Sequence, residues 1–480
     1  MKKAFLLFFI VNVFFSSYAS NKFDIRIANI EDEKGTSIIE FQNFYIISGY
    51  IKKGSSFGNY LVKLDKQGNL IEDTIIFMGT LNLCAVKLDD KFAVFRENSS
   101  SYPSNTSFEY TLFDTSLNVI YNKKLRLPDS LYASRYYVKM NKDSSFMISG
   151  VLNKPTTSQP VAFEPFIYKV SKAGDSLNLR VISNLNNSFE RAFNVRKVNK
   201  KYYVFMSSFS LYTLGSILVL DENLNTLDTL DIPNDLYDQY STLIMPDSTF
   251  LMCTLRFSSS QGQIYISKID TLSNVLTTKA FGNTSTFNYP AYQNSLSKKG
   301  NDIFLVFNVD FPLSNPFFGT GKPSFFKVQK LDENLNVKWE KKYGGDAFYH
   351  VYNVLATSDG GCIVIGNVND TINHNLNRDI FVLKYDSMGL ISWTNNITAT
   401  IQEIKVYPNP SSNNLHIELK NTHQQIENIK LIDIQGRLVY EQPIHSLQAT
   451  INVSYLSNGI YFIEGLTSEG DYFRQKFIKQ

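Results

Sequence analysis

One short pattern recurs along the chain at a nearly constant spacing, and it limits the fold more than any other feature. An apolar run ends at an Asp or Ser, a turn follows, and a second run begins, as in Leu61–Asp65 before Gly68. Successive copies are separated by 49 to 62 residues. A period of about 50 residues is typical of propellers and solenoids, in which each repeat stacks on its neighbours. The anchor residues of the copies are Asp65, Asp114, Ser171, Asp221, Asp270, Asp332 and Asp386.

Each copy contains four runs with the character of β-strands. An Asp at the start of a turn accepts hydrogen bonds from nearby backbone amides, so each anchor is expected to begin a hairpin turn. Most anchors are preceded by another apolar run, such as Phe250–Met252, and by a weaker alternating run, such as Phe193–Val198. Four-stranded units stacked radially bury both faces of each small sheet. The sequence therefore predicts an all-β protein with a seven-bladed β-propeller over residues 22–397, with six or eight blades as alternatives.

The closure of this ring has two candidate strands. Phe23–Ile27 resembles the outer strands of the repeat, although it lies before the first copy. It is expected to pair with the last blade and to join the two ends of the propeller. Gly389–Trp393 competes for the same place, because it directly follows the last anchor.

The end of the chain has a different texture from the repeat. Residues 404–480 contain about seven short strand-like runs separated by turn signals such as Asn458-Gly459, which is the pattern of a small β-sandwich. We expect an Ig-like β-sandwich here, joined to the propeller by a linker over residues 398–403.

The tail also carries a set of ordered motifs. It opens with Pro-Asn-Pro, continues with a Gly turn and a Gly-Ile-Tyr strand, and ends with basic residues. In this order it resembles the type A C-terminal sorting domain of cargo for the type IX (Por) secretion system of the Bacteroidetes. The resemblance implies translocation across the outer membrane by the type IX machinery through residues 404–480. It also implies removal of the tail between Thr394 and Lys405, and often attachment to surface lipopolysaccharide. The residues that carry the motifs are Pro408, Asn409, Pro410, Gly436, Gly459, Tyr461, Lys476 and Lys479.

The last two copies of the repeat resemble a bacterial propeller repeat more specifically. Lys330–Asp332 is followed by Trp339 and by Tyr343–Gly345, and the next copy contains Ser358–Gly361. The resemblance implies a propeller and names no ligand.

The N-terminus has the features of an export signal. Lys2 and Lys3 precede the apolar run Ala4–Phe15, and small residues follow up to Ala19. The run is shorter than the roughly 20 residues that span a membrane. We therefore predict a signal peptide over residues 1–19 and a final location in the medium or on the outer cell surface.

Several classes of chemistry lack support in the sequence. The chain has 47 basic and 44 acidic residues, and this near balance gives no reason to expect nucleic acid as a partner. The five histidines and three cysteines show no zinc spacing, so no cofactor or metal is expected. Cys84, Cys253 and Cys362 lie in apolar runs and are expected to be buried free thiols.

The longer connections between strands are the best candidates for binding. Residues 310–319 place Phe311, Phe317 and Phe318 in an irregular loop, where exposed rings would suit a glycan or a protein ligand. A loop folded back over the sheet edge is the alternative for these rings. The function that we expect is a binding protein for a glycan, polymer or protein. The alternatives are a structural spacer and a polysaccharide hydrolase or lyase that uses carboxylates on the propeller face, for which the candidates are Asp310, Asp346, Asp359 and Asp379.

Overall fold

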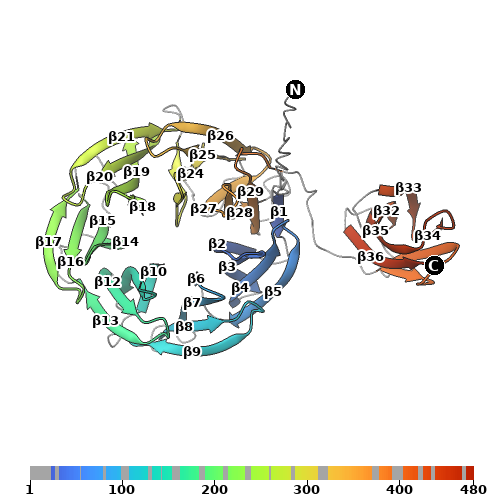
Figure 1. Ribbon diagram of the computed structural model, residues 1–480, viewed down its shortest axis with the longest axis horizontal. Helices are drawn as coiled ribbons and strands as arrows, with labels where there is room; N and C mark the ends of the chain where they lie inside the picture. The colour runs from blue at the N-terminus through green and yellow to red at the C-terminus, as the bar shows by residue number, and fades with distance from the viewer. Residues whose placement is uncertain are drawn as a thin grey trace, which may run out of the picture.

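The chain folds from strands, and the computed structural model has no helix among the residues that it describes (Figure 1). This confirms the predicted all-β class. The predicted signal peptide (residues 1–19) and linker (residues 398–403) lie outside the described residues. The described residues are 23–27, 32–53, 56–78, 83–98, 107–127, 132–141, 143–153, 163–182, 190–208, 215–232, 239–258, 261–282, 287–311, 323–369, 378–391, 404–419, 425–433, 438–467 and 472–480.

Nine sheets occur in the described residues, and seven of them lie between Phe23 and Tyr385. We number these antiparallel sheets as blades 1 to 7. Blades 1 to 3 consist of β2 (Asp32–Glu40), β3 (Phe44–Lys53), β4 (Ser56–Asp65) and β5 (Leu70–Met78); β6 (Leu83–Leu88), β7 (Lys91–Asn98), β8 (Ser107–Phe113) and β9 (Val119–Leu125); and β10 (Tyr132–Met140), β11 (Phe146–Asn153), β12 (Phe163–Val170) and β13 (Ser176–Val181).

Blades 4 to 7 continue this order with one variation in blade 6, where two short strands replace the first one. They consist of β14 (Glu190–Val198), β15 (Lys201–Ser208), β16 (Ser216–Leu220) and β17 (Thr226–Asp231); β18 (Gln239–Ile244), β19 (Phe250–Ser258), β20 (Gln261–Ile269) and β21 (Val275–Phe281); β22 (Tyr289–Pro290), β23 (Leu296–Lys299), β24 (Asp302–Val309), β25 (Phe325–Leu331) and β26 (Val337–Gly344); and β27 (Phe348–Ala356), β28 (Cys362–Asn369), β29 (Arg378–Tyr385) and β1 (Phe23–Ile27).

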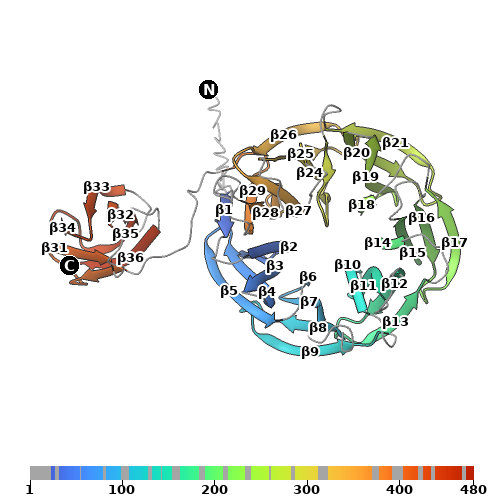
Figure 2. The ribbon, with the colours of Figure 1, turned by 180° about the vertical axis from the view of Figure 1, so that it is seen from behind.

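The blades form a ring, and the views from front and back agree on this arrangement (Figures 1 and 2). The first strand of each blade lies nearest the centre, and the fourth strand lies at the rim. Sheets stacked in this way bury both of their faces against their neighbours. The predicted β-propeller is therefore confirmed, and its described residues form seven blades.

The N-terminal strand closes the ring. β1 pairs antiparallel with β29, with Phe23 opposite Lys384 and Ile27 opposite Ile380, so it supplies the outer strand of blade 7. This is the pairing predicted for Phe23–Ile27. In the competing segment, residues 389–391 are not in a strand, and residues 392 and 393 lie outside the described part.

A glycine allows β1 to lie close to blade 1. Phe23 is fully buried, and a Cβ atom on Gly68 would lie 2.5 Å from its ring. Gly68 also has a φ of +90°, which glycine adopts without strain. Any other residue at position 68 would therefore push Phe23 away from the junction of blades 7 and 1.

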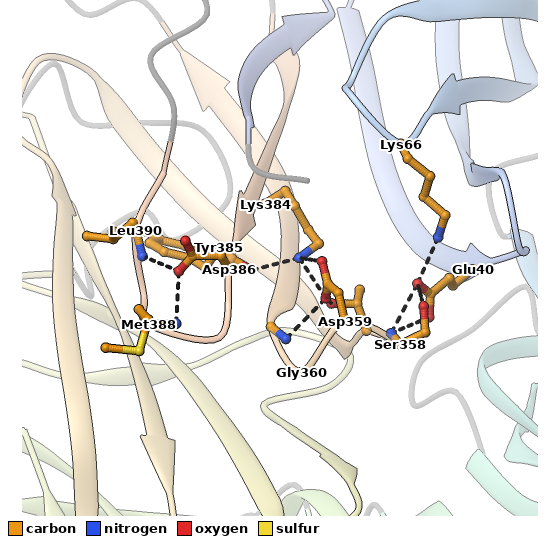
Figure 3. A network of polar contacts seen from close by, with 12 residues as sticks. Glu40, Lys66, Ser358, Asp359, Gly360, Lys384, Tyr385, Asp386, Met388 and Leu390 are labelled. Carbon is orange, nitrogen blue, oxygen red and sulfur yellow. Dashed lines mark hydrogen bonds and ion pairs between the residues drawn. The ribbon is translucent and has the colours of Figure 1, made fainter. Parts of the chain in front are cut away.

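A polar network joins the same two blades on the side of their tight turns (Figure 3). Glu40, the last residue of β2, accepts hydrogen bonds from the N–H of Ser358 at 2.9 Å and from its hydroxyl at 2.7 Å. Lys66 forms an ion pair with the same carboxylate at 2.8 Å. Burial opposes ionisation of Glu40, but these bonds to Lys66 and Ser358 hold its pKa below the usual value. The neighbouring Asp359 forms an ion pair with the fully buried Lys384 at 2.8 Å.

Aromatic side chains fill the spaces between blades. Between blades 2 and 3, the rings of Phe95 and Phe146 lie 5.0 Å apart, and those of Phe95 and Tyr110 lie 5.3 Å apart. All three side chains are fully buried. Burying a large apolar side chain contributes about 1.5–3 kcal/mol, so the many aromatic residues of the chain hold the ring together without a disulfide among the described residues.

The tail forms two sheets that share one core. β30 (Ile404–Tyr407), β31 (Asn414–Leu419) and β34 (Gln448–Asn452) form one sheet, and β33 (Leu438–Ser446), β32 (Ile426–Asp433), β35 (Gly459–Thr467) and β36 (Tyr472–Lys479) form the other. Buried residues from both sheets, such as Ile417 and Ile463, belong to a single apolar cluster. The tail is therefore a small β-sandwich, as predicted.

Within the described ranges, the chain contains no helix of the length and apolar character that crossing a bilayer requires.

Candidate functional site

The two faces of the propeller carry different connections. In an antiparallel sheet, the links from first to second strand and from third to fourth strand leave on one face, and the remaining links leave on the other. The first set is short, as at residues 41–43 and 66–69, and we call that side the short-turn face. The second set includes residues 99–106, 154–162 and 310–324, and we call that side the long-connection face. Since binding residues are often carried by loops on a rigid scaffold, the long-connection face is the natural place for a ligand.

The repeat anchors lie on the short-turn face and shape its turns. Each anchor accepts hydrogen bonds from the backbone N–H groups two and four residues later, at 2.9 and 2.8 Å for Asp332. The Ser171 hydroxyl accepts the equivalent bonds at 3.2 and 2.9 Å. The same pair of bonds occurs at Asp65, Asp114, Asp221, Asp270 and Asp386.

A cluster of aromatic and basic residues lies at the inner ends of blades 1, 6 and 7. Lys34 Nζ lies 4.3 Å from the centre of the Tyr352 ring, 5.5 Å from that of Tyr50 and 5.7 Å from that of Tyr292. The face of an aromatic ring attracts an ammonium group by about 0.5–2 kcal/mol. Together with Arg378, these four residues are called the Lys34 cluster below.

The pairing of the strands explains how these distant residues meet. Lys34 lies opposite Tyr50 in the β2–β3 register. The N–H of Tyr292 donates to the carbonyl of Val351 at 3.1 Å, which places this part of blade 6 beside β27. All the elements involved meet near the start of β2 and β27 and the end of β3, which is the long-connection side of the ring.

Arg378 is held at the edge of the cluster by a carboxylate. Its guanidinium forms two hydrogen bonds with Asp32, at 2.7 Å from Nε and 2.5 Å from Nη2. Its backbone N–H also donates to Asp32 at 3.0 Å. Bidentate pairs of this kind fix the plane of the guanidinium group, so Arg378 has a defined direction at the site.

Burial sets the protonation of the cluster. It lowers the pKa of Lys34 to about 7, with a further contribution from the charge of Arg378. Burial and the charges of Lys34 and Arg378 lower the pKa of His350 well below its usual value, so His350 is neutral. Burial also raises the pKa of Tyr352. At neutral pH, Lys34 is therefore an amine that can take up a proton or pair with an acidic group of a ligand.

The structure separates the two alternatives for Phe311. Its side chain is only 1% exposed, with its ring 5.6 Å from that of Phe348 and 5.0 Å from that of His350. Phe311 matches the alternative of a loop folded back over the sheet and is not an exposed ring, because the chain continues to pack inward just after β24. Phe317 and Phe318 lie outside the described residues, and their role as ligand-binding residues stays a prediction.

The four carboxylates proposed for catalysis occupy different places. Asp346 precedes β27 on the long-connection face and forms an ion pair with Arg26 at 2.6 Å. Asp359 follows β27 on the short-turn face and is paired with a lysine of β29. These two therefore do not converge. Asp310 is exposed after β24, and Asp379 is half-buried near the start of β29.

The cysteines differ in burial. Cys253 and Cys362 are buried as expected, whereas Cys84 is only partly buried. Burial raises the pKa of the Cys84 thiol to about 11 and that of the other two to about 12, so all three are neutral thiols. In the described part of the chain, no group of three or more His, Cys, Asp or Glu residues could hold a metal ion.

In the tail, the Pro-Asn-Pro motif lies against the last strand. The side-chain amide of Asn409 donates to the carbonyl of Lys476 at 3.1 Å and accepts from the N–H of Ile478 at 2.9 Å. It therefore spans both sides of Phe477. Pro408 and Pro410 are exposed on either side of Asn409.

Two further motif elements reach the same strand. Gly459 lies opposite Lys479 in the β35–β36 register, and the ring of Tyr461 lies 5.6 Å from that of Phe477. The Tyr461 hydroxyl donates to the carbonyl of Ser457 at 2.9 Å. Lys476 is exposed, whereas Lys479 is 6% exposed, and Gly436 lies outside the described residues. Around this region, the exposed apolar side chains are Tyr407, Ile460 and Ile478.

A comparison with known protein families matches this part of the chain. Residues 405–480 match the family described as "Secretion system C-terminal sorting domain". The chain carries a type IX sorting tail. Such a tail implies contact with the type IX machinery and export to the outer surface or the medium. No curated protein matches the sequence.

Several solved structures are similar to this chain at low sequence identity. A fungal alcohol oxidase of the AA5 family in complex with copper is 10% identical, with a TM-score of 0.46 over 96% of this chain and 98% of that chain. The β-propeller domain of the trilobed protease from Pyrococcus furiosus is 11% identical, with a TM-score of 0.44 over 77% and 99%. A duf4221 protein from Bacteroides vulgatus is 12% identical, with a TM-score of 0.36 over 63% and 91%. No activity follows from these likenesses.

Proposed function

We propose that this protein is an exported β-propeller that binds an acidic glycan through the Lys34 cluster. The observation that supports this most strongly is the partly exposed amine of Lys34 between the rings of Tyr50 and Tyr292, with the Arg378 guanidinium beside them. Sugar rings stack on aromatic side chains, and a sugar carboxylate pairs well with an amine and a guanidinium. The site therefore offers both kinds of contact that a uronic acid residue requires.

Binding accounts for the arrangement better than hydrolysis by two carboxylates. Such hydrolysis requires both groups to flank one bond, about 5–10 Å apart. Asp359 lies on the opposite face from Asp310, Asp346 and Asp379, and both Asp346 and Asp359 are engaged in ion pairs. The Lys34 cluster, in contrast, gathers residues of three blades on the face that carries the long connections.

The test is a titration with an acidic oligosaccharide, such as oligogalacturonate, and with a neutral oligosaccharide of the same length. The wild-type protein should bind the acidic oligosaccharide more tightly, and Lys34→Met should weaken that binding at least tenfold. The matched control is Lys200→Met, which removes an exposed lysine in a turn of the short-turn face. Equal affinity of the Lys34 and Lys200 variants, or no preference for the acidic oligosaccharide, would contradict the proposal.

A second candidate function is a polysaccharide lyase that acts at the same site. The observation in its favour is that burial lowers the pKa of Lys34 to about 7, where an amine serves well as a general base. A lyase would release an unsaturated sugar from the acidic oligosaccharide, which ultraviolet absorbance detects. Turnover that Lys34→Met abolishes would support the enzyme, and binding without turnover would support the glycan-binding protein.

For the tail, the proposal is that the secretion machinery contacts the exposed surface beside Asn409. Ile460 and Ile478 form a cross-strand pair there and are 42% and 38% exposed. Replacing both with Ser should reduce the exported fraction. The control is Leu447→Ser, which changes a side chain that is 40% exposed between β33 and β34 and should leave export unchanged. Equal export of both variants would contradict this contact. Attachment of the exported protein to lipopolysaccharide stays a prediction.

A further inference from the structure

The innermost strands of five blades share an irregularity that allows their residues to be aligned. β2, β10, β14, β18 and β27 each shift register against the second strand of their blade. After the shift, pairing resumes at one residue of the innermost strand. The residue two positions further along that strand occupies an equivalent place in each blade. The residues at this place are Ile39, Lys139, Arg196, Leu243 and Leu355.

The aliphatic members of this set show which way the position faces. Ile39 packs in a cluster with Val94 and Phe113 of blade 2, which is the next blade in the ring. Leu243 packs in the same way on blade 6, and Leu355 packs on blade 1. The position therefore faces the following blade, and in blades 3 and 4 it holds a cation in place of an aliphatic side chain.

Arg196 follows this rule, because its guanidinium reaches blade 5. Nε donates to the carbonyl of Thr242 at 2.9 Å, and Nη2 donates to the same carbonyl and to Asn194 Oδ1, the latter at 3.1 Å. Nη1 donates to the carbonyl of Val195 at 2.9 Å. Arg196 is 8% exposed, and none of these acceptors is a carboxylate. A guanidinium has five N–H groups, so one on Nη1 has no acceptor among the described residues.

Lys139 adds a second positive charge from the preceding blade. Its side chain is exposed although it lies on the innermost strand, so solvent reaches it inside the ring. Surrounding protein and the charge of Arg196 lower its pKa to about 8. No described carboxylate is paired with either cation. The guanidinium of Arg196, in contrast, is buried, and a buried cation without a carboxylate is unfavourable unless an anion balances its charge.

Two buried polar groups beside the guanidinium strengthen the case. Asn194 Nδ2 and Thr242 Oγ1 are buried and have no hydrogen-bond partner among the described residues. Asn194 is 5% exposed and Thr242 is fully buried. The Asn194 amide has a defined orientation, because its oxygen accepts from Arg196 and its nitrogen must therefore donate. Buried donors without partners are rare in native proteins, and a bound water or ion is the usual partner that completes them.

We propose that Arg196, Asn194 and Thr242 bind a small oxyanion between the innermost strands of blades 4 and 5. A guanidinium N–H, an amide N–H and a hydroxyl supply the hydrogen-bond donors, and the guanidinium of Arg196 supplies the charge. A phosphate, a sulfate or the carboxylate of a larger ligand has the matching acceptors. This site is separate from the Lys34 cluster and does not depend on the function proposed there.

The experiment measures the melting temperature of the full chain at increasing concentrations of sodium phosphate, sulfate or acetate. Sodium chloride is added to keep the ionic strength constant. A ligand that binds the native state raises the melting temperature with its concentration. Wild-type protein should show this rise with at least one of the three oxyanions. Asn194→Ala should weaken the apparent affinity at least tenfold, and Lys200→Met should leave it unchanged.

A second variant separates loss of binding from loss of fold. Asn194→Asp introduces a carboxylate beside Arg196, so it should replace the anion and remove the oxyanion dependence while the protein stays folded. No oxyanion dependence in the wild-type protein would overturn the proposal. An unchanged dependence in either Asn194→Ala or Asn194→Asp would overturn it as well.

Discussion

Phe23→Ala should destabilise the propeller strongly, because Phe23 joins the N-terminal strand to both blades at the point of closure. The side chain is fully buried between blades 7 and 1, where it meets Gly68 and Tyr45. Replacing a buried Phe with Ala typically costs about 3–5 kcal/mol. With an unfolding entropy of about 2.1 cal/mol/K per residue over roughly 360 residues, this cost lowers the melting temperature by roughly 4–7 °C.

Differential scanning calorimetry of the full chain tests this estimate. The tail has its own core and serves as an internal reference, since its transition should not move. The matched control is Leu177→Ala, which also shortens a large side chain but at a site on β13 that is 53% exposed. If Phe23→Ala shifted the propeller transition no more than Leu177→Ala, the closure of the ring by β1 would be refuted.

Three further predictions concern single side chains. Asp332→Ala removes the acceptor of two turn N–H groups and should lower the urea concentration at the midpoint of unfolding, and an unchanged midpoint would show that the turn does not need its anchor. Glu40→Gln should cost about 1–3 kcal/mol at pH 7. Since Glu40 has a lowered pKa in the folded protein, its contribution to stability is complete above the unfolded carboxyl pKa of about 4.3 and is lost as the pH falls. The unfolding free energies of wild type and variant should therefore converge in acid, and a difference that stays constant with pH would contradict this. Burial lowers the pKa of Lys34 to about 7, so the rate of its acylation, followed by peptide mass spectrometry, should level off above about pH 8, and a rate that keeps rising up to about pH 10 would contradict the lowered pKa.

The repeat could be predicted from the sequence because its signal is local. An anchor such as Asp332 acts on N–H groups two and four residues away, so the residues that form the turn are adjacent in the sequence. The sorting motifs are also short runs, although their meeting at Asn409 and Phe477 becomes visible only in the folded tail. Closure by Phe23–Ile27 was one of two alternatives, because both candidate segments have strand character and only the packing of Phe23 separates them.

The candidate sites could not be predicted in the same way. Lys34 and Tyr352 lie more than three hundred residues apart and meet only because blades 1 and 7 close the ring. The sequence signal that was available for Lys139 and Arg196 is a charged residue inside an alternating apolar strand. Its meaning depends on the register shifts of the inner strands, which the sequence does not show. Phe311 was expected in an irregular loop, yet its N–H donates to the carbonyl of Phe287 and keeps it within the packed region.

The measurement that tests the central claim most directly compares the complete chain with a chain that ends at residue 403, both produced in a bacterium with a type IX system. Mass spectrometry of the medium, the outer membrane and the periplasm would locate each protein and its termini. The complete chain should be found outside the outer membrane without residues 405–480, and the shortened chain should remain in the periplasm as a folded propeller. Equal amounts of both proteins outside the cell would contradict export by the tail.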